Sequence, residues 1–139
     1  APGHLVQGGG AQNEGIAHSA FVIEVPEDAI AEFDRVHLNQ VLWNLTHNAW
    51  RHGRRRTGSV VLRVPDRPGR VELHVIDDGE GVAKQLQAQL FEPFFTTFSG
   101  GTGLGLYIAR ELCAANAASL DYLDRGTGAD FRILWQVAQ

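Results

Sequence analysis

The segment that follows Asp34 has apolar residues at a helical period, and this feature restricts the fold more than any other. The apolar residues recur at intervals of three or four positions: Leu38, Val41, Leu42, Leu45 and Ala49. This spacing places them on one face of an α-helix. Asp34 before the pattern is typical of a helix N-cap, and Gly53 after it is typical of a helix end. A helix with one apolar face must bury that face, so the chain needs a second layer of structure.

Strand patterns supply the second layer. The segment 59–64 is rich in β-branched residues, and 70–76 alternates apolar and polar residues. The turn between them contains Pro68 and Gly69, so the two segments predict an antiparallel hairpin. Further strands are expected over 19–25, 120–123 and 130–137, a short helix over 83–90 and a long helix over 104–116. Candidate core positions on that long helix are Leu106, Ile108, Ala109, Leu112 and Cys113.

The order of these elements predicts an α/β fold. We expect a two-layer sandwich in which a mixed β-sheet is covered on one face by about three helices. The 139 residues suit a single domain, and 44% hydrophobic with 20% charged residues is an ordinary globular balance. Residues 1–17 are Gly-rich and predict a flexible linker or an expression remnant, which leaves 18–139 as the domain.

Composition also restricts the class of function. The net charge of −4 argues against general nucleic-acid affinity. A single cysteine cannot form an internal disulfide, which favours a reducing compartment. No apolar run approaches the roughly 20 residues that span a bilayer. The chain is expected to be a piece of a longer protein.

The first helix also has a polar stripe, opposite its apolar face, formed by Asn44, Asn48, Arg51 and His52. Asparagine is a poor helix former, so two of them one turn apart need an explanation. One interpretation is a solvated face. The other is a site, because a carboxamide oxygen suits Mg²⁺ that shares phosphate oxygens, and an arginine supplies a permanent positive charge.

Two glycine-rich turns offer further candidates. Asp77 ends a strand and is followed by alternating glycines at 79 and 81. This turn is either an ordinary Asx turn or a carboxylate placed to accept a hydrogen bond from an exocyclic amine such as that of adenine. Residues 100–106 run into the second long helix, and they form either a flexible linker or an anion site at the helix N-terminus.

These segments are informative as an ordered set: Asn44–Ala49, Asp77–Gly81, Phe91–Thr97 and Gly101–Leu106. The set resembles the N, G1, F and G2 boxes of the catalytic, ATP-binding domain of sensor histidine kinases. The resemblance covers about residues 20 to 137, and details near the second helix resemble the nitrogen-regulation and type IV pilus sensor kinases. It implies the Bergerat ATP-binding fold of the GHKL superfamily, with ATP and Mg²⁺ as cofactors.

The resemblance implies roles for individual residues. Asn48 would bind Mg²⁺, Asp77 would receive the adenine amine, and Asn44 and Arg51 would act near the phosphates as catalytic residues. The full set implied to bind ATP is Asn44, Asn48, Arg51, His52, Asp77, Gly79, Gly81, Val82, Phe95, Thr97, Gly101, Thr102, Gly103, Leu104, Gly105 and Leu106.

Three positions depart from the family pattern. Phe98 stands where a lid lysine is common, Ala129 where a threonine is common, and Ala117-Ala118 where two glycines are common. Because of Phe98 and Ala129, a degenerate module that senses ATP without transferring phosphate is an alternative function. A GHKL-type ATPase is a second alternative. Asn44 argues against it, because related hydrolases place a glutamate base there and an asparagine cannot accept a proton.

The partners follow from the same resemblance. The chain lacks the family's phosphoacceptor histidine motif, so the acceptor is expected on a dimerisation domain of the same parent protein, with a response regulator downstream. We expect a cytoplasmic protein-histidine kinase domain that is inactive in autophosphorylation alone. No nucleic acid and no membrane contact are expected for it.

Overall fold

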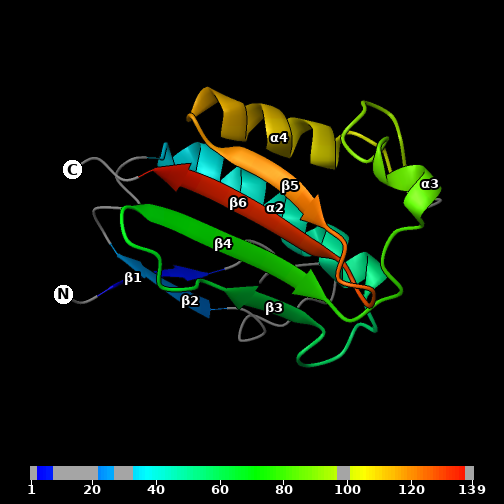
Figure 1. Cartoon of the computed structure of the whole chain (residues 1–139), viewed down its shortest axis with the longest axis horizontal. Helices are drawn as coiled ribbons and strands as arrows, with labels where there is room; N and C mark the ends of the chain where they lie inside the picture. Colours follow the sequence, from blue (N-terminus) through cyan, green and yellow to red (C-terminus); the bar gives the residue numbers. More distant parts are fainter. Residues whose placement is uncertain (1–2, 8–21, 27–32, 97–100, 137–139) are drawn as a thin grey trace.

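A sheet of four antiparallel strands in the order β3–β4–β6–β5 organises this computed structural model (Figure 1). The strands are β3 (Val60–Arg63), β4 (Arg70–Asp77), β5 (Ser119–Leu123) and β6 (Asp130–Gln136). The structure describes residues 33–96 and 101–136, and the backbone alone of 3–7 and 22–26. The expected hairpin is confirmed, with Val61 opposite Ile76.

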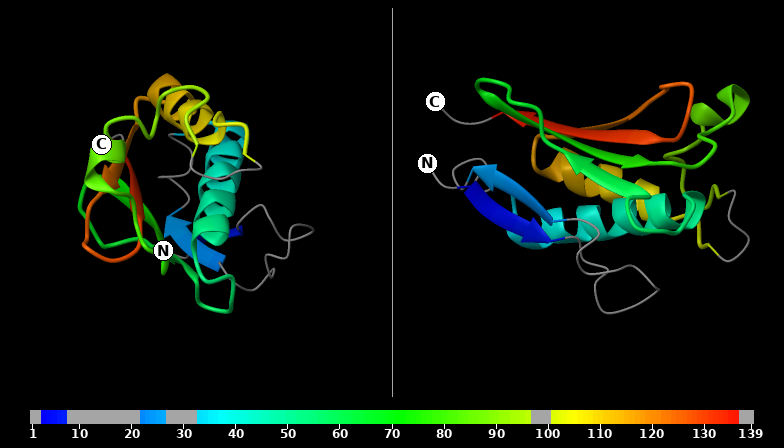
Figure 2. Two further views of the ribbon diagram at one scale, coloured as in Figure 1. Left: turned by 90° about the vertical axis from the view of Figure 1, so that its right-hand side faces the viewer. Right: turned by 90° about the horizontal axis from the view of Figure 1, so that it is seen from below.

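The helices are α2 (Arg35–His52), the short α3 (Lys84–Gln87) and α4 (Gly105–Ala115). The predicted limits of α2 are confirmed, because an Asp34 carboxylate oxygen accepts from the amide of His37 at 3.0 Å and the helix stops at Gly53. Helices α2 and α4 pack side by side on one face of the sheet (Figure 2). None of the helices among the described residues is long and apolar enough to cross a membrane.

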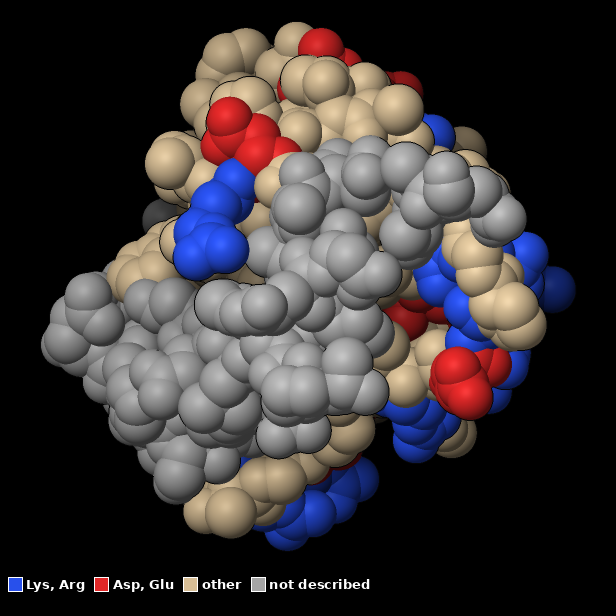
Figure 3. Space-filling view, turned by 90° about the vertical axis from the view of Figure 1, so that its left-hand side faces the viewer, with Lys and Arg blue, Asp and Glu red and all other residues tan. Residues whose placement is uncertain are grey.

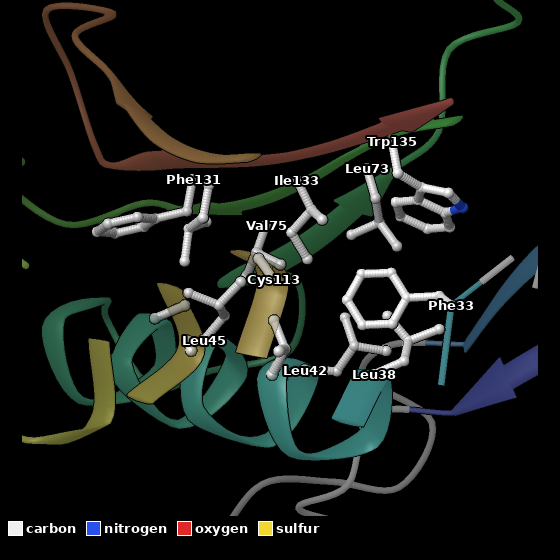
Figure 4. Packing of buried hydrophobic residues seen from close by; sticks show 14 of the residues in the cluster. Phe33, Leu38, Leu42, Leu45, Leu73, Val75, Cys113, Phe131, Ile133 and Trp135 are labelled. Atoms are coloured by element: carbon white, nitrogen blue, oxygen red, sulfur yellow. The ribbon is translucent and has the colours of Figure 1, made fainter. Parts of the chain in front are cut away.

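The core lies between these two layers (Figure 4). The predicted apolar face of α2 is fully buried, and it meets alternate residues of the two central strands. The buried strand residues shown there include Leu73, Val75, Phe131, Ile133 and Trp135. The predicted core face of α4 is partly wrong. Ala109 and Cys113 are buried, but Ile108 is 38% exposed because it lies on the outer side of the helix.

The two-layer α/β class is confirmed, and every strand pair among the described residues is antiparallel. A second sheet pairs β1 (Gly3–Gln7) with β2 (Val22–Pro26). Strand β2 overlaps the strand expected over 19–25, whose first three residues lie outside the described part. Strand β1 was not expected, since it falls within the range 1–17 read as linker. Its residues 4–7 interrupt the glycines with Leu5 and the β-branched Val6.

Candidate functional site

A cavity of about 840 Å³ is formed by α2, the end of β4 and the start of α4. Fourteen of the sixteen predicted ATP-binding residues line it: Asn44, Asn48, Arg51, His52, Asp77, Gly79, Gly81, Val82, Phe95, Gly101, Thr102, Gly103, Gly105 and Leu106. Leu104 is not part of the lining and instead occupies the N-cap position of α4. Thr97 lies outside the described residues. The four sequence segments therefore meet around one cavity.

Asp77 provides an unsatisfied buried acceptor in this cavity. Its side chain is buried, and its Oδ1 accepts hydrogen bonds from the amides of Gly79 at 2.8 Å and Ala129 at 3.2 Å. Its Oδ2 is buried and has no hydrogen-bond partner among the described residues. Burial raises the pKa of Asp77, and the two amides partly oppose that rise. A buried acceptor left unpaired costs about 1–3 kcal/mol, so a donor from a ligand would be favourable here.

The turn after Asp77 lies directly against the end of α2. A Cβ atom at Gly79 would collide with the carbonyl group of His52, so only glycine permits this approach. Asp78 links this turn to the segment that follows α2. Its carboxylate accepts from the amide of Arg54 at 2.8 Å and from the hydroxyl of Ser59 at 3.1 Å. These hydrogen bonds hold the pKa of Asp78 below its usual value. The cavity wall at Asp77 is thus held by contacts on both sides.

The polar stripe of α2 faces the cavity. The Nδ2 of Asn44 donates to the carbonyl oxygen of Gly105 at 3.0 Å, and its Oδ1 accepts from the side chain of Gln40 at 3.1 Å. Asn48 is half-buried one turn further along the cavity wall. The stripe therefore lines the cavity, where a ligand could contact it.

His52 lies at the exposed end of this stripe. Desolvation lowers the pKa of its imidazole, the Asp77 carboxylate opposes this, and the positive charge of Arg51 lowers it further. The imidazole therefore favours its neutral form, which suits a ring that lies against an uncharged part of a ligand.

The second glycine run is held against the chain segment that precedes it. The amide of Phe94 donates to the carbonyl oxygen of Gly103 at 2.7 Å, and a Cβ at Gly103 would collide with the Phe94 backbone. Helix α4 starts at Gly105, and the side chain of its N-cap Leu104 makes no capping hydrogen bond. The first amides of α4 can therefore bind an anion at this end of the cavity.

Several lining residues were missed by the sequence analysis. His47 is one of them, and the structure buries it in the cavity wall. Its Nδ1 donates to the carbonyl oxygen of Trp43 at 2.9 Å, and the two rings stack with centroids 3.9 Å apart. The spacing of four residues on α2 was the available signal for this pair.

The tyrosine hydroxyl of Tyr122 accepts from the amide of Val82 at 3.1 Å and supports the glycine turn from strand β5. The side chain of Gln87 donates to the carbonyl oxygen of Val82 at 3.0 Å. No local pattern could reveal these contacts, because they depend on how distant segments pack.

A metal ion in this cavity would need ligands in addition to the protein side chains. Among the residues that the structure describes, no group of three or more His, Cys, Asp or Glu side chains could hold a metal ion. Mg²⁺ commonly uses one or two protein oxygens together with water and substrate phosphates. The carboxamide of Asn48 fits that form of binding.

Comparisons with known proteins all indicate the same class of protein. A family model described as histidine kinase-, DNA gyrase B-, and HSP90-like ATPase matches residues 33–139. The sensor protein kinase PilS of Pseudomonas aeruginosa is 48% identical over 112 residues, which cover 76% of this chain and 21% of PilS. The C4-dicarboxylate transport sensor protein DctB of Rhizobium meliloti is 31% identical over 116 residues, which cover 82% of this chain and 19% of DctB.

Solved structures agree with this. Full-length ShkA in complex with AMPPNP is similar with a TM-score of 0.64 and 35% identity, covering 76% of this chain and 23% of ShkA. The nucleotide-free catalytic domain of the histidine kinase ThkA has a TM-score of 0.66 and 29% identity, covering 76% of this chain and 69% of that domain. The chain spans about a fifth of the length of the curated relatives PilS and DctB.

The chain belongs to the family of histidine kinase-, DNA gyrase B- and HSP90-like ATPases. Within it, the relatives and structural neighbours named above are sensor kinases and histidine kinase domains, which confirms the class and fold that the four sequence segments indicated.

Proposed function

We propose that this domain binds Mg-ATP in the cavity and donates the γ-phosphate to a histidine on a dimerisation domain outside this chain. The observation that carries the proposal is the buried Oδ2 of Asp77, which has no partner among the described residues. The other carboxylate oxygen is already engaged by two amides. A ligand with an amine at this depth completes the hydrogen bonding of the site.

The same oxygen accounts for selection of the base. An ionised carboxylate can only accept hydrogen bonds, and the exocyclic amine of adenine can donate one. Guanine would present a carbonyl oxygen at the equivalent position, so two acceptors would face each other in a buried environment. Sites built around such a hydrogen bond reject ligands that lack the donor.

Other residues of the cavity wall suit the triphosphate. Asn48 would share Mg²⁺ with phosphate oxygens, and Mg²⁺ supplies positive charge against the developing negative charge. Arg51 and the first amides of α4 would bind the phosphate oxygens. Phosphoryl transfer depends mainly on positioning and charge stabilisation, which these groups provide.

Asn44 favours transfer to histidine over hydrolysis. Its carboxamide is bound on both sides, to Gly105 and to Gln40, and it cannot accept a proton at neutral pH. Water needs a base to become a good nucleophile, whereas a neutral imidazole does not. The partner domain would therefore bring the nucleophile, and a response regulator would receive the phosphoryl group from it. A domain of this kind would act in the cytoplasm.

The test is a calorimetric titration of the chain with AMPPNP, with and without Mg²⁺, followed by addition of the parent protein's dimerisation domain and γ-labelled ATP. We expect binding that Mg²⁺ strengthens, loss of that Mg²⁺ effect in Asn48→Ala, and label on the added domain. Steady release of phosphate by the chain alone would support a hydrolase instead. Binding without any transfer to the added domain would support an ATP-sensing module.

A further inference from the structure

A buried row of charged side chains lies on the face of the sheet opposite the helices. The Nε2 of His74 contacts Oε2 of Glu72 at 2.7 Å, and its Nδ1 contacts Oδ1 of Asp130 at 2.8 Å. All three residues are buried, with exposed fractions of 8% or less. A histidine held between two buried carboxylates serves no part of the phosphate chemistry described above.

Arginines complete the row at both ends. The Nε of Arg125 donates to the second oxygen of Asp130 at 3.0 Å. At the other end, Arg67 and Arg70 each lie 3.7 Å from Oε1 of Glu72. On the side of the molecule drawn in Figure 3, acidic and basic side chains of the described residues lie beside one another.

The hydrogen bonds join the row into one network. A carboxylate can only accept, so a His74 ring nitrogen that carries a proton can donate to the carboxylate it contacts. His74 thus links the Asp130–Arg125 pair at one end of the row to Glu72 and its two arginines at the other end. The hydrogen bond from His74 holds the pKa of Glu72 below its usual value, in agreement with an ionised carboxylate. Charge-assisted hydrogen bonds of this kind are stronger and more directional than neutral ones.

Asp130 connects this row to the nucleotide cavity through its neighbour in the chain. The amide of Ala129 donates to Oδ1 of Asp77, and the amide of Asp77 donates to the carbonyl oxygen of Ala129 at 3.0 Å. The Asp130 side chain is therefore fixed to β4 through His74 and to the start of the 125–129 turn through Arg125. Ala129 is the residue directly before it. The clamped side chain therefore lies one residue from the Ala129 amide that donates to Asp77.

We propose that Asp130 is a positioning residue for adenine recognition: clamped by His74 and Arg125, it holds the Ala129 amide on Oδ1 of Asp77 and leaves Oδ2 free for the base. The inference rests on the proposed role of Asp77 in binding adenine. Without the clamp, the 125–129 turn can shift, the Ala129 hydrogen bond lengthens, and the Asp77 carboxylate can rotate. No described hydrogen bond joins the 125–129 turn to Asn48 or to the start of α4, so we expect triphosphate binding to be affected less.

The test compares ATP with purine riboside triphosphate, which has the same sugar and phosphates but lacks the exocyclic amine. Both are titrated calorimetrically, with Mg²⁺, into the wild-type chain and into Asp77→Asn, Asp130→Asn and Arg125→Gln. In Asp130→Asn we expect ATP affinity to fall about tenfold, and the affinity for purine riboside triphosphate to change less than about twofold.

Asp121→Asn is the matched control. Asp121 lies in the same sheet and pairs with Arg132 at 3.4 Å, but it contacts neither Asp77 nor Ala129 in any described hydrogen bond. Its variant should bind both nucleotides as the wild type does. Equal weakening of both nucleotides in Asp130→Asn would show a purely structural role, and unchanged ATP affinity would overturn the inference directly.

Variants of Arg125 test the same inference if Asp130→Asn does not fold. The Arg125 side chain is 58% exposed, so Arg125→Gln should fold and weaken ATP selectively, and Arg125→Lys should restore most of the loss. Unchanged selectivity in Arg125→Gln would then overturn the inference. The comparison of wild type with Asp77→Asn tests the proposed function itself. If the two bind ATP equally well, the assignment of Asp77 to adenine binding is wrong.

Discussion

The side-chain amide of Asn44 donates to the carbonyl oxygen of Gly105 at 3.0 Å and joins two helices that are 61 residues apart in the sequence. Gly105 is the first residue of α4, at the end of the glycine run. This hydrogen bond therefore fixes the N-terminal end of α4 relative to the polar stripe of α2. It gives Asn44 a role that a carboxylate could not have, because a carboxylate cannot donate to a carbonyl oxygen.

Replacing Asn44 by leucine should weaken nucleotide binding and stability together. The variant keeps the side-chain size but loses the donor, so the Gly105 carbonyl is left without this partner. We expect a loss of about 1 kcal/mol in the free energy of unfolding and a several-fold weaker affinity for AMPPNP. Chemical denaturation and calorimetry measure the two effects. Gln40→Ala, which removes the more exposed of the two contacts of Asn44, is the control and should have little effect on affinity.

The affinity for ATP should decrease in acid because of Asp77. Burial raises the pKa of Asp77 in the free domain, and the adenine amine binds only the ionised carboxylate, so bound ATP lowers that pKa again. Affinity is therefore complete above the pKa of the free domain and falls as the pH drops through it. Purine riboside triphosphate controls for titration of the phosphates and of His52. An ATP affinity that parallels this control at every pH would contradict the account.

Ala117→Gly should stabilise the domain. Ala117 follows α4 with a φ of 56°, in the left-handed region that disfavours side chains, at a position where related kinases commonly have glycine. We expect the free energy of unfolding to rise by about 0.5–1 kcal/mol, measured by chemical denaturation. Ala118→Gly, next to it but without a positive φ, should destabilise the domain. An equal effect of the two substitutions would argue against relief of strain.

Cys113 should resist thiol reagents in the native state. Its side chain is completely buried on α4, and burial raises the pKa of its thiol to about 12. Because the thiolate is the reactive form, labelling at pH 8 should be slow in buffer and fast in denaturant. The rate of labelling then measures opening of the core. Rapid native labelling would show that α4 separates readily from the sheet.

The sequence predicted those features that depend on local pattern. The spacing of apolar residues defined α2 to within one residue, and the Pro-Gly turn defined the β3–β4 hairpin, because both patterns are contained in short segments. The glycines of the two turns were correctly brought to one cavity through the family resemblance.

Features that depend on contacts between distant segments could not be predicted. The amide of Ala129 on Asp77 comes from 52 residues further along the chain, and His74 has the same alternating pattern as any exposed strand residue. Ile108 fits the helical period but faces outward, because the sheet covers only part of α4. The strand β1 was missed because glycine dominates the segment around it.

The measurement that most directly tests the account is a double-mutant cycle between Asp77 and the exocyclic amine of the base. ATP and purine riboside triphosphate are titrated into the wild-type chain and into Asp77→Asn, with Mg²⁺ present throughout. The account predicts that wild type prefers ATP by at least about tenfold and that Asp77→Asn loses this preference while it still binds both triphosphates. Equal affinity of the wild type for the two nucleotides would contradict the central claim that the free Oδ2 of Asp77 receives the adenine amine.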